Sequence, residues 1–336
     1  MTSPVGQRRP AGASTQLRLV SQVARLYHGR HLRQREIAER LHMSQARVSR
    51  LLAMAQDEGI VRTVVAVPEG LYPELETAVE LAYGVAEVHV VEVTEDKAIP
   101  YELGSVAAQY FSDSPLDGRV IGFTSWSSTL RVMARELATG RGVRGRTVVE
   151  MLGDLGSPDL QHDAARATQR LSAALGADPV YLRTPGVVPD AARRAAVLHD
   201  PYVARTIELL GRLDVAFVGV GPADTHGPLR AGDNFFSADQ LRAVRAAGAA
   251  GQLLQRFVDA DGRAVRTDLD ELVVGITLPQ LRAAGRRIVV AGGASKHAAL
   301  AACLRGGWID LLITDLASAR HLAATAGQPD ESRFAY

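Results

Sequence analysis

Cysteine and lysine are both scarce in this chain of 336 residues. Cys303 is the single cysteine, so no disulfide can form within the chain, and we expect a reducing compartment, the cytoplasm. Lysine occurs only at positions 97 and 296, whereas arginine occurs 36 times. Because arginine supplies nearly all the positive charge, a lysine placed in a loop indicates a site that requires a compact ammonium group.

Long apolar runs are lacking as well. No run approaches the roughly 20 residues that a helix needs to cross a bilayer. Residues 1–14 are polar, with Pro, Gly and Arg but without the apolar core of a signal peptide, and we expect them to be disordered. His162, His199 and His297 are too scattered to predict a metal site, and no cofactor is expected.

Charge of both signs is present, but it is unevenly distributed. Residues 1–62 carry eleven arginines and four acidic residues, a net charge of +7, whereas the remainder carries −6. The length fits two or more domains. A basic N-terminal module joined to a mildly acidic body predicts a polyanionic partner for the first module only.

Residues 33–52 predict two short helices joined by a tight turn at His42 and Met43. Apolar residues recur every three to four positions in both helices, as expected for helices with one buried side, at Ile37, Ala38, Leu41, Val48, Leu51 and Leu52. Ser44 stands where the second helix needs a cap. The pattern is typical of a DNA-binding helix-turn-helix. The side chains that we expect to reach DNA are Gln34, Ser44, Gln45, Arg47, Ser49 and Arg50.

Further helical and extended segments flank this motif. An amphipathic helix over 15–28 completes a three-helix unit, Gly59 ends the last helix, and 60–67 is predicted to be extended. We therefore assign 15–67 to a helix-turn-helix domain. Residues 68–84 form a linker and connector helix, with the helix at 72–83.

The body, residues 85–330, alternates short apolar runs with amphipathic stretches. Predicted strands are 86–93, 119–123, 147–152, 179–183, 213–219, 253–258, 272–276, 287–291 and 309–313. Predicted helices are 98–112, 128–139, 160–175, 190–198, 202–211, 237–247, 296–305 and 315–325. This alternation predicts a Rossmann-like α/β domain whose mostly parallel sheet is covered on both faces. Asp261-Gly262 predicts a hairpin turn within 258–265.

Ligands of such sheets bind at the carboxyl ends of strands, and three loops stand there. In the first, 122–129, the hydroxyls of Thr124, Ser125, Ser127, Ser128 and Thr129 cluster before a helix. Hydroxyls and the amides at a helix start suit a phosphate, although capping alone would need only one Ser or Thr.

The second and third loops are rich in glycine. Gly219 and Gly221 end a strand and would let a ligand approach the backbone, although such turns are common. In the third, Lys296 follows Gly292 and Gly293. A cation at a helix start opposes the helix dipole unless an anion lies between them, which favours a ligand role over a solvated lysine.

Polar residues after the second loop are further candidates. Asp224, Asp233 and Asn234 could bond sugar hydroxyls, or simply make turns. Trp126 could stack on a sugar or pack against the sheet edge.

A series of segments in chain order resembles the SorC/DeoR-type sugar-binding transcriptional regulators over nearly the whole length of the chain. The N-terminal match is Gln34-x-Glu36-Ile-Ala-Glu-Arg-Leu-x-x-Ser44-x-x-x-Val-Ser-Arg-Leu-Leu52. Matches in the body include Leu198-x-Asp200-Pro, Asp214-Val-Ala-x-Val-Gly-x-Gly221, Gly232-x-Asn234, Phe257-x-Asp-x-x-Gly262, Ala291-Gly-Gly293-x-x-Lys296 and Leu312-Ile-Thr-Asp315.

This resemblance implies an effector domain related to ribose-phosphate isomerases and glucosamine-phosphate deaminases. It also implies a phosphorylated sugar or related metabolite as effector, and dimers or tetramers on DNA. On that basis the loop 125–129 and Lys296 look like the phosphate site, and Asn234 like a sugar contact. The chain departs from an Asn-Gly-Gly-like turn of many members, because it has Leu152-Gly-Asp154 there.

The resulting hypothesis is a cytoplasmic homodimer or homotetramer that binds a double-stranded DNA operator in response to a phosphorylated sugar, and not an enzyme. The rival is a sugar-phosphate isomerase or deaminase with an added domain. However, Asp154, Asp224 and His226 are better explained as turn or loop residues, and His297 has no carboxylate beside it in its loop. A third alternative is a helix-turn-helix that contacts only other proteins. It conflicts with the net charge of +7 carried by residues 1–62.

Overall fold

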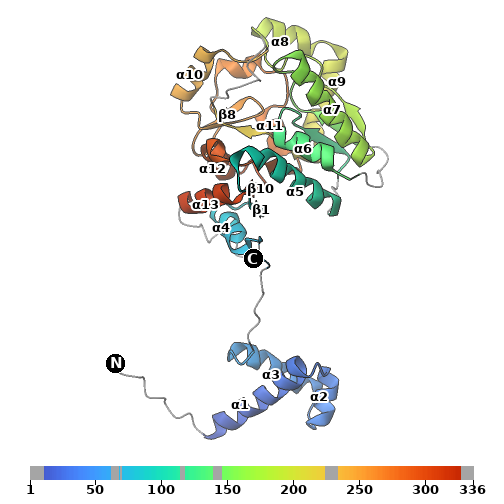
Figure 1. The fold of residues 1–336 in the computed structure, drawn as a ribbon, viewed down its shortest axis with the longest axis vertical. Helices are drawn as coiled ribbons and strands as arrows, with labels where there is room; N and C mark the ends of the chain where they lie inside the picture. The colour runs from blue at the N-terminus through green and yellow to red at the C-terminus, as the bar shows by residue number, and fades with distance from the viewer. Residues whose placement is uncertain are drawn as a thin grey trace. The chain divides into compact units, whose positions relative to one another are not determined.

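The computed structural model describes residues 11–61, 68, 70–113, 118–138, 146–223 and 234–326 (Figure 1). The chain divides into two compact units, residues 1–67 and 68–336, and each is described by itself. No helix among these residues is long and apolar enough to cross a membrane.

The N-terminal unit consists of three helices. They are α1 (Ala11–Ala24), extended by a π-helical turn (Arg25–Gly29), α2 (Gln34–Arg40) and α3 (Gln45–Asp57). Their apolar sides meet in one core, in which Val20, Ile37 and Val48 are fully buried. Helix α1 begins at Ala11, inside the segment 1–14 that we expected to be disordered. Residues 1–10, and 62–67 of the expected extended segment, lie outside the described residues.

The body is built on a parallel sheet of seven strands in the order β1-β10-β9-β5-β2-β3-β4. The strands are β1 (Glu87–Val91), β2 (Val120–Phe123), β3 (Thr147–Glu150), β4 (Asp178–Val180), β5 (Val215–Phe217), β9 (Arg286–Val290) and β10 (Leu311–Asp315). Short runs of Val, Ile and Leu suit strands that are buried on both faces. The predicted parallel α/β sheet is confirmed.

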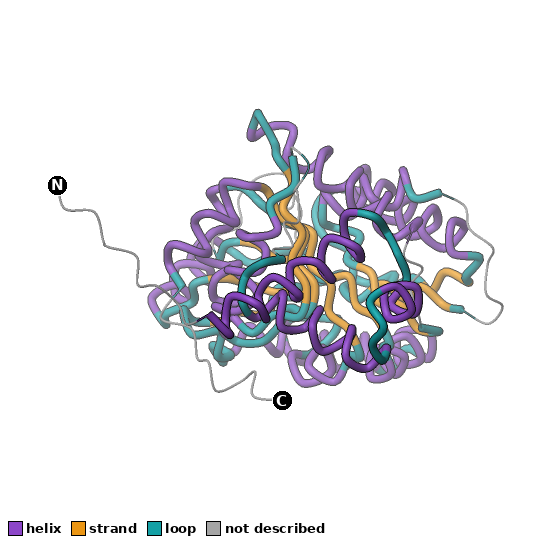
Figure 2. Tube along the Cα trace, turned by 90° about the horizontal axis from the view of Figure 1, so that it is seen from below, coloured by secondary structure: helices purple, strands orange, loops and turns teal. Residues whose placement is uncertain are grey.

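Helices cover both faces of the sheet (Figure 2). They are α4 (Pro73–Tyr83), α5 (Ile99–Asp113), α6 (Ser128–Glu136), α7 (Pro158–Leu175), α8 (Ala191–Leu198), α9 (Pro201–Leu209), α10 (Ala238–Ala246), α11 (Leu278–Ala283), α12 (His297–Arg305) and α13 (Leu316–Thr325). Successive residues of a strand point to opposite faces of the sheet and pack into two separate hydrophobic cores. Ile121 and Phe217 pack with α5, α6 and α7, whereas Ala216 and Leu312 pack with α4, α12 and α13. The period-two alternation of strand side chains produces this division.

Two predicted strands are wrong. The run 253–258 is a hairpin of β7 (Gly251–Leu253) and β8 (Arg256–Val258), which forms an antiparallel sheet with β6 (Val220–Gly221). Its turn residues Leu254 and Gln255 have φ of 50° and 64°, a left-handed conformation that apolar periodicity does not reveal. The run 272–276 follows a 3-10 helix (Asp268–Leu272) and makes only isolated bridges, such as Leu152 with Gly275.

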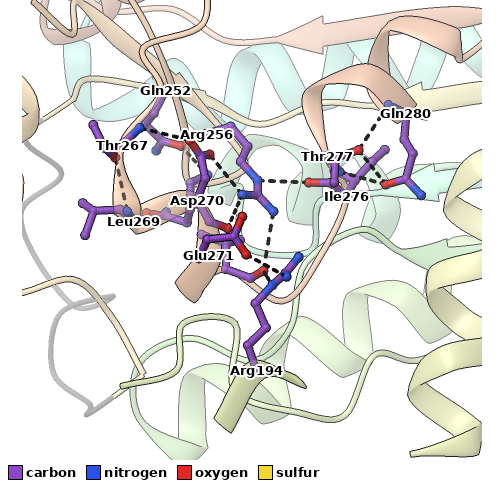
Figure 3. Close-up of polar contacts among 12 residues, drawn as sticks. Arg194, Gln252, Arg256, Thr267, Leu269, Asp270, Glu271, Ile276, Thr277 and Gln280 are labelled. Carbon is purple, nitrogen blue, oxygen red and sulfur yellow. Dashed lines mark hydrogen bonds and ion pairs between the residues drawn. The ribbon is translucent and has the colours of Figure 1, made fainter. Parts of the chain in front are cut away.

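A buried arginine holds this second run in place (Figure 3). Arg256 is 4% exposed and donates to the carbonyl oxygen of Asp270 at 2.7 Å, to its carboxylate at 3.0 Å and to the carbonyl of Ile276 at 3.3 Å. Arg194 donates from α8 to the carbonyl of Val273 at 2.9 Å. The carbonyls of Val273 and Ile276 thus accept from arginine side chains, whereas Val274 bonds through its backbone to Gly153 and Gly186. The run therefore makes isolated bridges and no continuous strand. Burial lowers the pKa of Arg256, and Asp270 opposes that shift.

The predicted turn at Asp261-Gly262 is present. The backbone N–H of Asp259 donates to the carbonyl of Arg263 at 2.9 Å, and Gly262 has φ +76°. A Cβ at Gly262 would lie 2.3 Å from the carbonyl oxygen of Ala302, closer than any real contact. Trp308 also donates to the carbonyl of Gly262 at 2.7 Å, so this turn is part of the packing around α12.

Gly262→Ala should therefore destabilise the protein much more than Gly248→Ala. Gly248 shares a positive φ of +95° but has open space around it, so its substitution isolates the backbone cost. We expect about 1 kcal/mol for Gly248→Ala and a further ~1–3 kcal/mol for Gly262→Ala from the clash. Denaturant unfolding of the full chain, followed by tryptophan fluorescence, measures both. Equal losses would contradict the packing described for this turn.

Candidate functional site

The strand order places the site between β2 and β5. Along the chain, β3 and β4 follow on one side of β2, whereas β5, β9 and β10 lie on the other. The direction of winding therefore reverses between β2 and β5, and ligands of open α/β sheets bind at such a point, beyond the carboxyl ends of the strands. The three predicted loops follow β2, β5 and β9, which are neighbours.

A pocket of about 170 Å³ lies among these loops. It brings together five of the predicted residues, Ser127, Ser128, Gly219, Gly221 and Lys296. Thr124 and Trp126 of the first loop line it too. Sequence reasoning missed the contributions of Leu152, Leu155, Gln252, Leu254 and Gln255. The first two follow β3, and the others belong to the β7–β8 hairpin, whereas the sequence predicts a single strand at 253–258.

The first loop contains hydroxyls with different surroundings. Ser127 caps α6, because its Oγ accepts from the N–H of Leu130 at 3.3 Å, and Ser128 is exposed. Ser125 and Thr129 are each 1% exposed and do not line the pocket. Thr124 donates to the carbonyl of Phe217 at 2.7 Å and accepts from the N–H of Gly219 at 3.1 Å. The hydroxyl of Thr124 therefore ties the first loop to the second.

The glycines of the third loop serve packing. A Cβ on Gly292 would lie 2.0 Å from Oδ2 of Asp315, and the N–H of Gly293 donates to that same oxygen at 2.7 Å. Ser318 accepts from the N–H of Gly293 at 3.0 Å. Neither glycine lines the pocket. Asp315 at the end of β10 thus fixes the loop that carries Lys296.

Lys296 supplies the positive charge of the pocket. It is half-buried, and its Nζ has no ion-pair partner among the residues that the structure describes. Burial lowers the pKa of Lys296. A cation without a counter-ion, beside the start of α6, is suited to hold an anion.

Asn234 does not line the pocket. Its Nδ2 donates to the carbonyl of Asp154 at 2.9 Å, while its buried Oδ1 has no partner within the described part of the chain. Asp154 forms an ion pair with Arg183 at 2.8 Å, and burial raises the pKa of this carboxyl. Asp224, Asp233 and His226 lie outside the described residues. His297 contacts Ser318 at 3.1 Å and stacks on His321.

A second candidate surface lies on α3 of the N-terminal unit. Gln45, Arg47, Ser49 and Arg50 are exposed, and Gln34 at the start of α2 is partly so. Ser44 caps α3, since its Oγ accepts from the N–H of Arg47 at 3.3 Å. His42 takes a left-handed conformation, φ 53°, in the turn between α2 and α3. The described residues contain no group of acidic, His and Cys side chains that could hold a metal ion.

Known proteins share both the sequence and the fold. Residues 71–324 match the family described as "Putative sugar-binding domain". The deoxyribonucleoside regulator of Bacillus subtilis is 31% identical, with 90% of this chain and 96% of the relative covered. The crystal structure of the full-length sorbitol operon regulator SorC from Klebsiella pneumoniae has a TM-score of 0.69 and 25% identity, and covers 92% of this chain and 99% of that one.

The crystal structure described as "a domain of a possible sugar-binding transcriptional regulator" from Arthrobacter aurescens gives a similar result. Its TM-score is 0.67 at 29% identity, with 77% of this chain and all of that chain covered. The sheet and these matches define a sugar-binding regulator of transcription. The chain belongs to the SorC family of sugar-binding transcriptional regulators.

The unpaired charge of Lys296 should cost stability when no ligand is bound. Because burial lowers the pKa of Lys296, the folded state disfavours the ammonium, and this penalty is present at neutral pH and disappears above the ordinary pKa of lysine. Lys296→Met should therefore raise the Tm at pH 7, with a smaller gain as the pH approaches 10. The exposed Lys97→Met serves as the control and should leave the Tm unchanged. A lower Tm for Lys296→Met at pH 7 would contradict this account.

Proposed function

We propose that this protein binds a DNA operator through α3 and that a phosphorylated sugar in the pocket modulates this binding. The observation that carries the proposal is that Lys296, which has no ion-pair partner among the described residues, lines the same pocket as the capped start of α6. An ammonium, serine hydroxyls and helix-start amides together form a site for a phosphate group. The names of the relatives, a deoxyribonucleoside regulator and a sorbitol operon regulator, support a carbohydrate-related effector.

The DNA-binding part of the proposal rests on the outer surface of α3. Val48, Leu51 and Leu52 are buried against α1 and α2, so the opposite side of the helix is free for a major groove. Arg47 and Arg50 can contact phosphates or guanine, and Gln45 and Ser49 base edges, while Gln34 is placed to contact the backbone. Ser44 contributes by fixing the start of α3.

Regulation requires that the effector bind more tightly to one of two arrangements of the protein. A ligand can shift the operator equilibrium only through this difference in affinity. One recognition helix buries too little surface to discriminate an operator from genomic DNA, so we propose a homodimer or homotetramer that acts in the cytoplasm.

Arg47→Ala and Arg50→Ala should each weaken binding to duplexes that the wild-type protein selects from a random library. We expect a loss of about tenfold, with a smaller salt dependence if the lost contact was to phosphate. Arg212→Ala is the charge-matched control, because Arg212 is exposed in the body and pairs with Glu208. Fluorescence anisotropy at several salt concentrations measures these affinities. If both variants bind as the wild type does, α3 is not the recognition helix.

Lys296→Met should leave affinity for the selected duplex intact and abolish the response to sugar phosphates. The physical reason is loss of the only lysine charge in the pocket, without a change in α3. Lys97→Met should keep the response. The same preparations are assayed for conversion of the sugar phosphates. An unchanged response in Lys296→Met would remove this residue from the site, and turnover without DNA binding would favour the isomerase or deaminase alternative.

A further inference from the structure

A second pocket, with a volume of about 620 Å³, lies beside α11 and the 3-10 helix Asp268–Leu272. Among the residues that the structure describes, none lines both this pocket and the one at the carboxyl ends of β2 and β5. The charged side chains that line the second pocket are Arg194, Arg256, Arg266, Arg282, Asp270 and Glu271. Four guanidinium groups against two carboxylates leave a net charge of +2, whereas the chain beyond residue 62 carries −6. This pocket, called the arginine pocket below, is therefore a basic site on an acidic body.

The donors of Arg256 are already used within the protein (Figure 3). Its side chain is 5% exposed and pairs with Asp270 at 3.0 Å. Its Nε donates to the carbonyl of Ile276 at 3.3 Å, and its Nη2 to that of Val273 at 3.5 Å. Arg256 and Asp270 thus compensate each other, and a ligand must be held by the other cations of the pocket.

Arg194 is only partly neutralised. Its Nε donates to the carbonyl of Val273 at 2.9 Å, while its Nη1 lies 3.4 Å from Oε2 of Glu271. The side chain of Glu271 is 68% exposed, and an exposed ion pair at this distance contributes little. Within the described part of the chain, Nη2 of Arg194 has no acceptor. Arg194 therefore keeps both a charge and a donor for a ligand.

Arg282 is held in position and also keeps donors for a ligand. Its Cζ lies 3.6 Å from the centroid of the Trp308 ring, and its Nη1 donates to two backbone carbonyls at 2.8 and 3.2 Å. A guanidinium has five N–H groups, and those on Nε and Nη2 have no acceptor among the described residues. Asp310, the carboxylate that acts on Arg282 electrostatically, pairs with Arg287 at 2.6 Å.

Arg266 is exposed and forms no hydrogen bond or ion pair with the residues that the structure describes. One exposed arginine needs no ligand, because water solvates it. Arg194, Arg266 and Arg282, however, come from α8, from the chain before the 3-10 helix and from α11, and line one pocket. Like charges repel one another, and the carboxylates of the pocket offset only part of this repulsion. The grouping favours an anionic ligand over three independently solvated side chains.

The rest of the lining indicates what kind of anion fits. Ala264, Leu278 and Pro279 offer apolar contacts to a carbon frame. The volume is within the roughly 300–1,000 Å³ that is typical of small-molecule sites. Guanidinium groups recognise carboxylate and phosphate oxygens, often through two parallel hydrogen bonds. Several guanidinium groups in one pocket suit a ligand with more than one acidic group.

We infer that the arginine pocket is a second ligand site, which binds a small organic anion carrying two or more carboxylate or phosphate groups. Arg194, Arg266 and Arg282 bind the acidic groups, and the apolar side chains contact the carbon frame. This inference goes beyond the proposed function, because it uses neither Lys296 nor the outer surface of α3.

Calorimetric titration of the full chain with citrate and with 3-phosphoglycerate tests the inference, and acetate at matched ionic strength is the reference. Both the wild type and Lys296→Met are titrated, because the variant removes the charge of the other pocket. In both proteins at least one of the two polyanions should bind about tenfold or more tightly than acetate. Equal affinities for all three anions would refute the inference and leave the proposed function standing. A polyanion that binds the wild type but not Lys296→Met occupies the other pocket, which also refutes it.

Arg266→Gln in the Lys296→Met protein locates the bound anion. It should weaken binding by about tenfold through the loss of a charged donor. Arg205→Gln removes an exposed arginine outside both pockets and should change the affinity by less than about twofold. Because Arg266 is exposed, its substitution should not affect folding.

Arg282→Gln is the second variant, and light scattering gives the oligomeric mass of every protein. Full affinity for the polyanion in both Arg266→Gln and Arg282→Gln would overturn the inference. A lower mass of Arg266→Gln, without polyanion binding to the parent protein, would overturn it too, because the pocket would then be a contact between copies of the chain.

Discussion

The pocket depends on the hydroxyl of Thr124, which joins two parallel strands where the winding of the sheet reverses. By donating to the carbonyl of Phe217 and accepting from the N–H of Gly219, it holds the β2 loop against the β5 loop. A Cβ on Gly219 would lie 2.8 Å from the Thr124 methyl group, so the close approach needs a glycine. The start of α6 and the backbone around Gly221 can therefore face one ligand.

A second constraint comes from β10. The buried carboxylate of Asp315 accepts from Gly293 and Ser318, and it occupies the space that a side chain at Gly292 would take. This arrangement fixes the β9 loop and thereby the position of Lys296. Lys296 has no ion-pair partner among the described residues, and burial lowers its pKa. Within this one loop, Gly292 and Gly293 pack against Asp315, whereas Lys296 contributes the charge of the pocket.

Several features of the fold followed from the sequence. The helical spacing of Ile37, Val48 and Leu51 predicted the buried sides of α2 and α3, and the Val-rich runs predicted the parallel sheet. The prediction of one strand at 253–258 was wrong because the left-handed turn is formed by Leu254 and Gln255. Such turns are normally marked by glycine or asparagine, and neither occurs here. The run 272–276 misled because a buried arginine from another segment bonds its carbonyls.

The sequence by itself determined the classes of element, the loops that follow β2, β5 and β9, and the rarity of the lysine at position 296. Those properties depend on residue type and on short-range spacing. Only the tertiary structure decided that Ser127, Ser128 and Lys296 share a pocket, that Ser125 and Gly293 stay out of it, and that three leucines line it. These outcomes depend on which distant segments meet, and that is fixed by strand order and by contacts such as Arg256 with Asp270, which local patterns do not encode.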